Sequence, residues 1–255
     1  MLSYQPLGDS GLRIEFSKEI NRATIIKIRS FLDILEAQGH KFIIESVPGY
    51  NTLTVFYRPL LISYEGLVCI CKELERQHFS TFTNLTETID ILNVKDLSNA
   101  KDTFKVSDRV IEIPVLYGGE HGPDLEDVAY TNGLTAEQVI EIHAEPVYLV
   151  YIIGFTPGFP YLGEMSEKIA TPRLAEPRLN VKAGSVGIAN QQTGIYSVDS
   201  PGGWRIIGHT PLKIFNPASD TPFLLNAGDM LIFKSIDRDE YEEIHGRVEH
   251  EQHRH

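Results

Sequence analysis

Glycine and proline are distributed very unevenly along this chain of 255 residues. Residues 154–217 hold nine of the 20 glycines and seven of the 14 prolines, whereas residues 67–113 contain neither. Helix interiors disfavour both residue types, and tight turns between short strands use both. We therefore expect two regions of different construction: regular elements first, then short strands joined by tight turns.

The first region has the apolar spacing of alternating strands and helices. Residues 12–16 alternate as in a half-buried strand, and residues 20–35 have helical spacing. The remaining elements are predicted as two strands, a helix and a closing strand, at 41–47, 52–57, 61–77 and 89–94. This is the split βαβ order of a ferredoxin-like domain. We predict the α+β class, with a ferredoxin-like α/β sandwich over residues 1–100.

Residues 96–108 are polar and lack periodicity, which places the domain boundary there. Beyond it we predict a strand at 110–116, then helices at 125–130 and 136–143 that Asp124 and Thr135 would cap. Short strands follow at 147–154, 185–190, 195–198, 204–207, 212–215 and 230–234. Such a series favours a closed antiparallel β-barrel over residues 101–240. Residues 241–255 are expected to form a flexible acidic and histidine-rich tail.

The chain is acidic, with 35 Asp and Glu against 23 Lys and Arg and a formal net charge of −12. This charge repels a phosphate backbone, so nucleic acid is excluded as a general partner. No run of about 18 apolar residues occurs, so we expect no membrane-spanning helix. No secretory signal is visible, and Cys69 and Cys71 fit neither a disulfide framework nor a CxxC motif. We therefore predict a cytoplasmic protein with buried, reduced thiols.

The first of three unusual loops spans residues 154–163, with the sequence GFTPGFPYLG. Its prolines and glycines predict a stiff loop that presents Phe155, Pro157, Phe159 and Tyr161. Two interpretations stay open. The rings either plug the core under a turn or form a surface for a partner.

The second and third loops lie around Ser185 and around the pair Gly202 and Gly203. Ser185 approximates the G-x-S-x-G nucleophile elbow, but that elbow needs a following helix and strands are predicted here, so a hydrolase nucleophile is disfavoured. The backbone N–H groups of paired glycines can approach an anion closely, and Arg205 can assist. The alternative is a hairpin corner in which Trp204 anchors the core.

Motifs for nucleotide and metal binding are missing from the sequence. It has no G-x-x-x-x-G-K-[ST] loop and no G-x-G-x-x-G after a strand. His121, His143 and His209 are dispersed, and the tail histidines are better explained as part of a solvated terminus. A self-sufficient ATPase or metalloenzyme is therefore disfavoured, and no metal site is assigned.

Two long segments and one residue pair resemble one known family. They are GFTPGFPYL at 154–162, the pair Pro172 and Arg173, and AGSVGIANQQTGIYSVDSPGGWRIIGHTP at 183–211. In these segments the chain closely resembles the KipI/PxpB family, also labelled allophanate hydrolase subunit 1. Shorter matches near residues 6–9 and 113–119 extend the resemblance over nearly the whole chain.

The resemblance implies a small amino-terminal α/β domain and a carboxy-terminal cyclophilin-like barrel. It also implies a role as the B subunit of an ATP-dependent 5-oxoprolinase, which opens the lactam of 5-oxoproline to glutamate together with an A partner and a homologous C partner. ATP would serve the complex, and this chain would be inactive alone. Two alternatives follow from the same family: a carboxyltransferase-like unit, as in urea amidolyase, and an inhibitor of a sporulation histidine kinase.

No catalytic residue is assigned. We expect Gly184 and Ser185 to act as hydrogen-bond donors to substrate and Gln192 and Tyr196 to form polar walls, while the anion cradle would consist of Gly202, Gly203 and Arg205. The chain departs from the family pattern at Lys182, where proline is usual, and at His209, where arginine is usual. Imidazole does not replace a bidentate guanidinium, so the second departure matters if the family arginine binds a carboxylate, and Lys182 would then supply a nearby charge instead.

Overall fold

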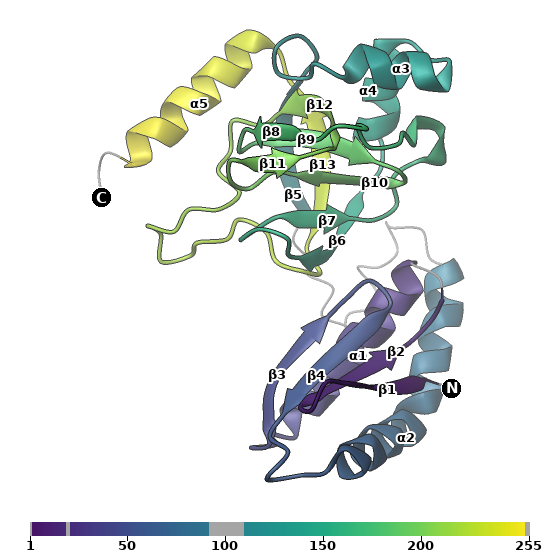
Figure 1. Cartoon of the computed structure of the whole chain (residues 1–255). Helices are drawn as coiled ribbons and strands as arrows, with labels where there is room; N and C mark the ends of the chain where they lie inside the picture. Colours follow the sequence, from purple (N-terminus) through teal and green to yellow (C-terminus); the bar gives the residue numbers. More distant parts are fainter. Residues whose placement is uncertain (1, 19–20, 92–109, 253–255) are drawn as a thin grey trace. The chain divides into compact units, whose positions relative to one another are not determined.

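A computed structural model describes residues 2–18, 21–91 and 110–252 of the chain. The chain divides into two compact units, Met1–Phe104 (unit 1) and Lys105–His255 (unit 2) (Figure 1). In the part of the chain that the structure describes, no helix is both long and apolar enough to cross a membrane.

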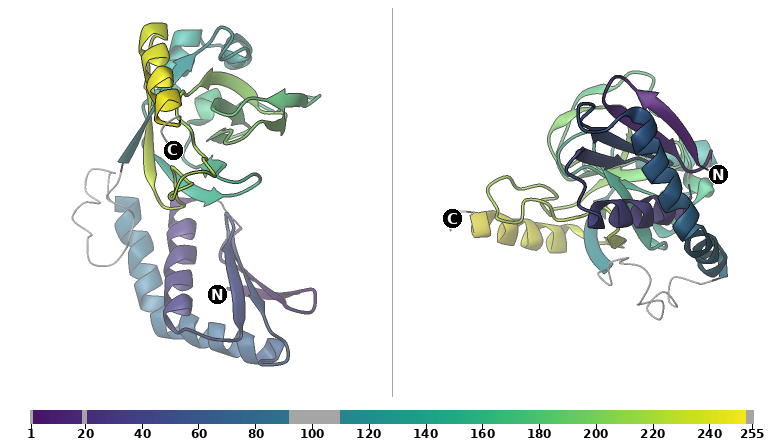
Figure 2. Two further views of the ribbon diagram at one scale, coloured as in Figure 1. Left: turned by 90° about the vertical axis from the view of Figure 1, so that its left-hand side faces the viewer. Right: turned by 90° about the horizontal axis from the view of Figure 1, so that it is seen from below.

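Unit 1 is a four-stranded antiparallel sheet with two helices on one face (Figure 2). Its elements are β1 (Ser3–Leu7), β2 (Gly11–Glu15), α1 (Arg22–Ala37), β3 (Ile43–Pro48), β4 (Thr52–Tyr57) and α2 (Tyr64–Ile91). The strand order is β1-β2-β4-β3. Alternate residues of β2 and β4 point at the helices, and side chains such as Leu12, Val55 and Phe31 form the core.

The closing strand predicted at 89–94 is wrong where the structure describes it, because residues 89–91 belong to helix α2 and the rest lie outside the described residues. The edge of the sheet next to β2 is occupied by β1 instead. Strand β1 escaped prediction because four of its five residues are exposed, which leaves no apolar alternation. The layered α+β arrangement is present, but the ferredoxin-like assignment is not confirmed. Cys69 is exposed and only Cys71 is buried, since residues two apart on a helix point in different directions.

Unit 2 is built on a closed seven-stranded barrel in the order β10-β7-β6-β13-β5-β12-β9. Its strands are β5 (Val110–Tyr117), β6 (Tyr148–Ile153), β7 (Pro160–Leu162), β9 (Ser185–Ala189), β10 (Gln192–Ile195), β12 (Arg205–His209) and β13 (Met230–Ser235). The barrel is not wholly antiparallel as predicted, because β13 pairs with β5 in parallel. Of the predicted strands, 195–198 is displaced to β10, and 212–215 contributes only an isolated bridge between Phe215 and Phe223.

Helices and a small sheet surround the barrel. They are α3 (Leu125–Asn132), α4 (Ala136–Ala144), the 3₁₀ helix η2 (Glu167–Ile169), the paired strands β8 (Arg178–Val181) and β11 (Ser200–Gly202), and α5 (Arg238–Gln252). Thr135 caps α4 in a capping box, as its position predicted, whereas the Asp124 side chain caps nothing.

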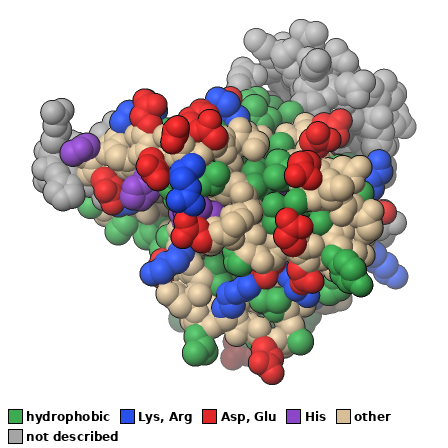
Figure 3. Space-filling view, turned by 90° about the horizontal axis from the view of Figure 1, so that it is seen from above, with side chains coloured by type: hydrophobic (Ala, Val, Ile, Leu, Met, Phe, Trp, Pro, Cys, Tyr) green, Lys and Arg blue, Asp and Glu red, His purple; other side chains and the backbone are tan. Residues whose placement is uncertain are grey.

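Helix α5 replaces most of the expected flexible tail (Figure 1). The side chain of Tyr241 is 8% exposed and holds the first turns of the helix against the barrel. Acidic and basic side chains are interspersed on the face of unit 2 that carries α5, with histidines along the helix (Figure 3). The helix is therefore a solvated element anchored at one end.

Candidate functional site

A cluster of aromatic rings fills the space between the barrel and the β8/β11 sheet. Phe159 lies at its centre, with ring centroids 5.4 Å from Tyr196, 5.4 Å from Trp204 and 4.8 Å from Tyr161. We call these four residues the ring cluster. Phe159 is 1% exposed, whereas Phe155 is 65% exposed in the same loop. The loop is therefore divided: Phe159 is part of the core, whereas Phe155 and Pro157 face solvent, and the partner surface stays a prediction for these two residues.

Gly184 and Ser185 lie in a turn that Tyr196 closes. The N–H of Gly184 donates to the carbonyl of Tyr196 at 2.7 Å, and the N–H of Tyr196 donates to the carbonyl of Ser185 at 2.9 Å. Ser185 N–H donates to the carbonyl of Lys182 at 3.1 Å. The amides of Gly184 and Ser185 are thus engaged within the fold. The donor that we expected from Gly184 was this amide, whereas the donor expected from Ser185 was its hydroxyl, and Ser185 is buried. A Cβ at Gly184 would lie 2.6 Å from a ring carbon of His209, so this glycine is required for close packing.

The two departures from the family pattern, Lys182 and His209, brace this same turn. Lys182 Nζ donates to Asp199 at 2.8 Å, and this bond, together with the N–H of Ala183, lowers the pKa of Asp199. His209 Nε2 donates to the carbonyl of Ala183 at 2.8 Å, which leaves Nδ1 to accept from the Tyr241 hydroxyl at 2.9 Å. Burial lowers the pKa of His209. Both side chains therefore have structural partners.

The paired glycines differ from each other. A Cβ on Gly202 would clash with the hydroxyl of Tyr196, whereas a Cβ on Gly203 would meet nothing closer than 3.6 Å. Gly203 uses its carbonyl to accept from Leu174 N–H at 2.7 Å. Close to them, the buried hydroxyl of Ser200 has no hydrogen-bond partner among the described residues. Gly202 thus serves packing, and Gly203 leaves room beside its backbone.

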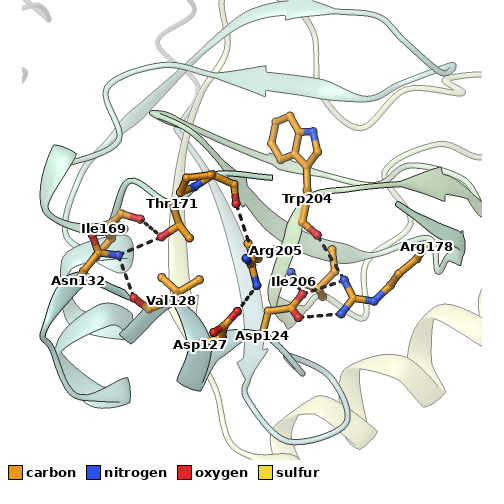
Figure 4. A network of polar contacts seen from close by, with 11 residues as sticks. Asp124, Asp127, Val128, Asn132, Ile169, Thr171, Arg178, Trp204, Arg205 and Ile206 are labelled. Carbon is orange, nitrogen blue, oxygen red and sulfur yellow. Dashed lines mark hydrogen bonds and ion pairs between the residues drawn. The ribbon is translucent and has the colours of Figure 1, made fainter. Parts of the chain in front are cut away.

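Arg205 does not join these glycines (Figure 4). Its guanidinium forms an ion pair with Asp127 and donates through Nε to the carbonyl of Pro172 at 3.2 Å. Successive side chains of a strand alternate, so Arg205 lies on the face of β12 opposite Trp204 and Ile206. Gln192 is also remote from Tyr196 and the paired glycines. It is the first residue of β10 and lies opposite Ala189, at the end of the strand away from Tyr196. The expected site residues that the structure brings together are Gly184, Ser185, Tyr196, Gly202 and Gly203.

An ion pair that the sequence analysis missed joins α3 to the β8/β11 sheet. Both oxygens of Asp124 accept from Arg178, at 2.7 and 2.9 Å, and one also accepts from Ile206 N–H at 2.6 Å (Figure 4). The Asp124 side chain is 9% exposed, so the pair is largely shielded from water. No local pattern signals a contact between residues so far apart in sequence.

A second buried network surrounds His143. Its Nδ1 lies 2.8 Å from the Tyr117 hydroxyl and its Nε2 lies 2.8 Å from the Thr193 hydroxyl. Burial lowers the pKa of His143 to about 3, so the ring is neutral and serves the fold. Across the described ranges, no three His, Cys, Asp or Glu side chains are grouped as metal ligands.

The fold and the candidate site define the class of protein: the chain is a mixed α+β protein with a closed seven-stranded barrel and a ring cluster on the outside of that barrel. Residues 2–225 match the family model described as carboxyltransferase domain, subdomain C and D. The chain therefore belongs to this carboxyltransferase domain family.

Individual relatives agree with that family. The chain is 42% identical over 237 residues to the 5-oxoprolinase B subunit of Bacillus subtilis, which covers 93% of this chain and 94% of that protein. A crystal structure of a conserved uncharacterized protein from Pyrococcus horikoshii is 43% identical, with a TM-score of 0.52 and coverage of 94% and 100% of the two chains. Kluyveromyces lactis urea carboxylase is only 17% identical, with a TM-score of 0.71 over 97% of this chain and 23% of that protein, and shows a shared fold alone.

Proposed function

We propose that this chain is the B subunit of an ATP-dependent 5-oxoprolinase that opens 5-oxoproline to glutamate together with its A and C partners. The observation that carries the proposal is the 42% identity with a protein of that name across nearly the full length of both chains. The five expected site residues that lie together around Tyr196 all fall within the matched family region.

The chemistry explains why several subunits would be needed. A lactam amide is a poor electrophile, and ATP activates it when the carbonyl oxygen is phosphorylated. Water then adds to the activated carbon, the C–N bond of the ring breaks, and a second water releases the phosphate, so that 5-oxoproline, ATP and two waters give glutamate, ADP and phosphate. This chain has no glycine-rich phosphate loop, so we assign the nucleotide to another part of the complex. Here the ring cluster and Gly203 would form one wall that orients the lactam. The chain would be inactive alone.

We assign the surface around Phe155 and Pro157 to contact with the homologous C partner. Phe155 is exposed on a loop that Gly154 and Phe159 fasten at its base, through N–H to carbonyl bonding at 3.0 Å. A rigid exposed aromatic ring is the kind of side chain that dominates interface energies. We expect Phe155→Ala to weaken the complex about tenfold or more, while Tyr130→Ala, an exposed ring on α3, leaves it unchanged.

The deciding experiment mixes the purified chain with its A and C partners and measures ADP and glutamate formed in the presence of 5-oxoproline. We expect turnover to require all three proteins. Turnover without this chain would overturn the proposal. Failure to bind the C partner, together with inhibition of a histidine kinase, would establish the regulatory alternative instead.

The family description favours a second candidate, a carboxyltransferase-like unit. The same reconstituted mixture distinguishes it when urea and an activated carboxyl donor replace 5-oxoproline. Transfer of the carboxyl group from that donor to urea, without consumption of 5-oxoproline, would support this alternative.

A further inference from the structure

Arg173 differs from the other arginines near the ring cluster because it is exposed and has no carboxylate partner among the described residues. Arg178 and Arg205 are paired with Asp124 and Asp127. The guanidinium carbon of Arg173 lies 5.8 Å from the centroid of the Trp204 ring, within the range of a cation–π contact. Trp204 is 5% exposed, so a fixed ring supports the cation.

The backbone that carries Arg173 is held on both sides. Thr171 and Asn190 exchange two backbone hydrogen bonds, at 3.2 and 2.7 Å. On the other side, Leu174 N–H donates to the carbonyl of Gly203 at 2.7 Å. Such anchoring reduces the entropy lost when the side chain binds a ligand.

Arg205 completes this anchoring. Its Nε donates to the carbonyl of Pro172, the residue directly before Arg173, while Asp127 holds its Nη1. The arginine that sequence reasoning placed in an anion cradle therefore fixes the segment that presents another arginine. Its charge is neutralised by Asp127, whereas the charge of Arg173 is available.

Two tyrosines lie near the guanidinium. Burial raises the pKa of Tyr161 and Tyr196, and the charge of Arg173 opposes that rise in both. The Tyr161 ring centroid is 6.1 Å from that of Trp204, and Tyr161 is partly exposed. A ligand that reaches Arg173 would thus meet the accessible part of the Tyr161 ring beside the positive charge.

We propose that Arg173, supported by Trp204 and flanked by Tyr161, binds the carboxylate of a small organic acid. Guanidinium donors form a fork that matches a carboxylate, and Tyr161 would contact the body of the ligand. Arg205 is a positioning residue that acts through Pro172. The proposal rests on the proposed function only where it names 5-oxoproline as the acid.

Trp204 is the only tryptophan of the chain, so its fluorescence reports directly on this site. The full chain is titrated with 5-oxoproline and with 2-pyrrolidinone, which has the same lactam ring without the carboxylate. We expect a saturable change with 5-oxoproline and none with tenfold higher 2-pyrrolidinone. Calorimetry, which needs no fluorescence signal, then gives Kd for each variant.

We expect Arg173→Gln to raise Kd by about ten- to a hundredfold, because it removes a charge-assisted hydrogen-bond pair. Arg173→Lys keeps the charge without the fork and is expected to give an intermediate Kd. Lys213→Gln removes an exposed charge elsewhere in unit 2 and is expected to leave Kd unchanged. Unchanged melting temperatures show that the variants are folded.

The positioning role of Arg205 is tested in a double-mutant cycle. Arg205→Gln is expected to raise Kd less than Arg173→Gln, and to add nothing once Arg173 is already replaced. A further rise of Kd in the double variant would show that Arg205 acts independently of Arg173.

The outcomes separate this proposal from the proposed function. Wild-type affinity in Arg173→Gln, confirmed by an unchanged KM for 5-oxoproline in the reconstituted complex, would overturn the site. Arg173-dependent binding of L-proline or L-glutamate, without binding of 5-oxoproline, would keep the carboxylate site and reject the proposed substrate.

Discussion

The two units differ in how they treat buried polar groups. In unit 1, the buried polar residue among the described side chains is Thr24, and the core consists of apolar side chains. Unit 2 buries many more: Asp124, His143, Thr171, Ser185, Thr193, Ser197, Ser200, Thr210 and Asp229. Unit 1 also buries single polar atoms, among them the Ser46 hydroxyl. A buried polar group is costly unless it is hydrogen-bonded, so unit 2 needs specific partners at more positions than unit 1.

The difference shows what the polar groups of unit 2 are for. Asp124 ties α3 to Arg178 of β8 and to the backbone of β12, and Asp127 ties α3 through Arg205 to Pro172. These connections place the loops around the ring cluster. An apolar core accepts rearranged side chains of similar volume, whereas a hydrogen-bonded network fixes one arrangement. The proposed binding surface is built on loops and would need that second property.

Of the variants below, Asp124→Ala is expected to destabilise unit 2 most strongly. It leaves Arg178 without its carboxylate and Ile206 N–H without its acceptor, and should lower the free energy of unfolding of unit 2 by about 3 kcal/mol. Urea unfolding followed by Trp204 fluorescence measures this, since the one tryptophan lies in unit 2. Glu126→Ala, an exposed acid on the same helix, is the control. Equal midpoints for the two variants would show that the network adds no stability.

Lower pH should weaken unit 2 through His143. Its pKa is about 3 in the folded unit and about 6.5 when unfolded, so between these values only the unfolded chain binds the proton. Stability therefore falls as pH drops below about 6.5, by roughly 1.4 kcal/mol per pH unit, or about 2 kcal/mol at pH 5. Urea midpoints at pH 7 and pH 5 test this in the wild type and in His143→Gln. The loss of unfolding free energy between pH 7 and pH 5 should be about 2 kcal/mol smaller in His143→Gln than in the wild type. An equal loss in both proteins would contradict the assignment.

Gly202 and Gly203 are adjacent, but we expect their substitution by alanine to change the stability of unit 2 by different amounts. Gly202→Ala places a methyl group against the Tyr196 hydroxyl and should cost about 1–3 kcal/mol in overpacking. Gly203→Ala has room and should change unfolding by less than about 0.5 kcal/mol. Unfolding midpoints of the two variants give the answer. If Gly203→Ala lowers the stability more than Gly202→Ala, the packing of Gly202 against Tyr196 does not determine the backbone conformation at these two glycines.

The smallest effect is expected at Ser200. Its buried hydroxyl has no partner among the described residues, so Ser200→Ala removes a desolvated group without breaking a bond. Stability should stay the same or rise by up to about 1 kcal/mol. A loss larger than that, measured by the same unfolding assay, would reveal a partner for the hydroxyl.

Local patterns predicted the elements whose faces differ in polarity. The alternation at 12–16 gave β2, and Thr135 before an apolar stretch gave the start of α4. Strand β1 was missed because four of its five residues are exposed and only Tyr4 is partly buried. A strand at 89–94 was predicted where residues 89–91 continue helix α2. Short apolar runs fit either element, and only packing decides between them.

The site was harder to predict than the fold. Phe155 and Phe159 are the same residue type in one loop, and only the positions of Tyr196 and Trp204 make the second one buried. Arg205 has the positive charge expected of an anion site, but its ion pair with Asp127 neutralises that charge. Sequence spacing singled out three loops, but the partners of each side chain come from elements far along the chain.

The parallel pairing of β13 with β5 determines when the barrel can close while the chain is being synthesised. Met230 lies opposite Val110, so the first and last strands of the barrel are neighbours. A ribosome must release nearly the whole of unit 2 before the barrel can close, whereas the four strands of unit 1 are complete by Tyr57. During that interval the unpaired edge of β5 is exposed, and nascent chains are most vulnerable to mispairing there.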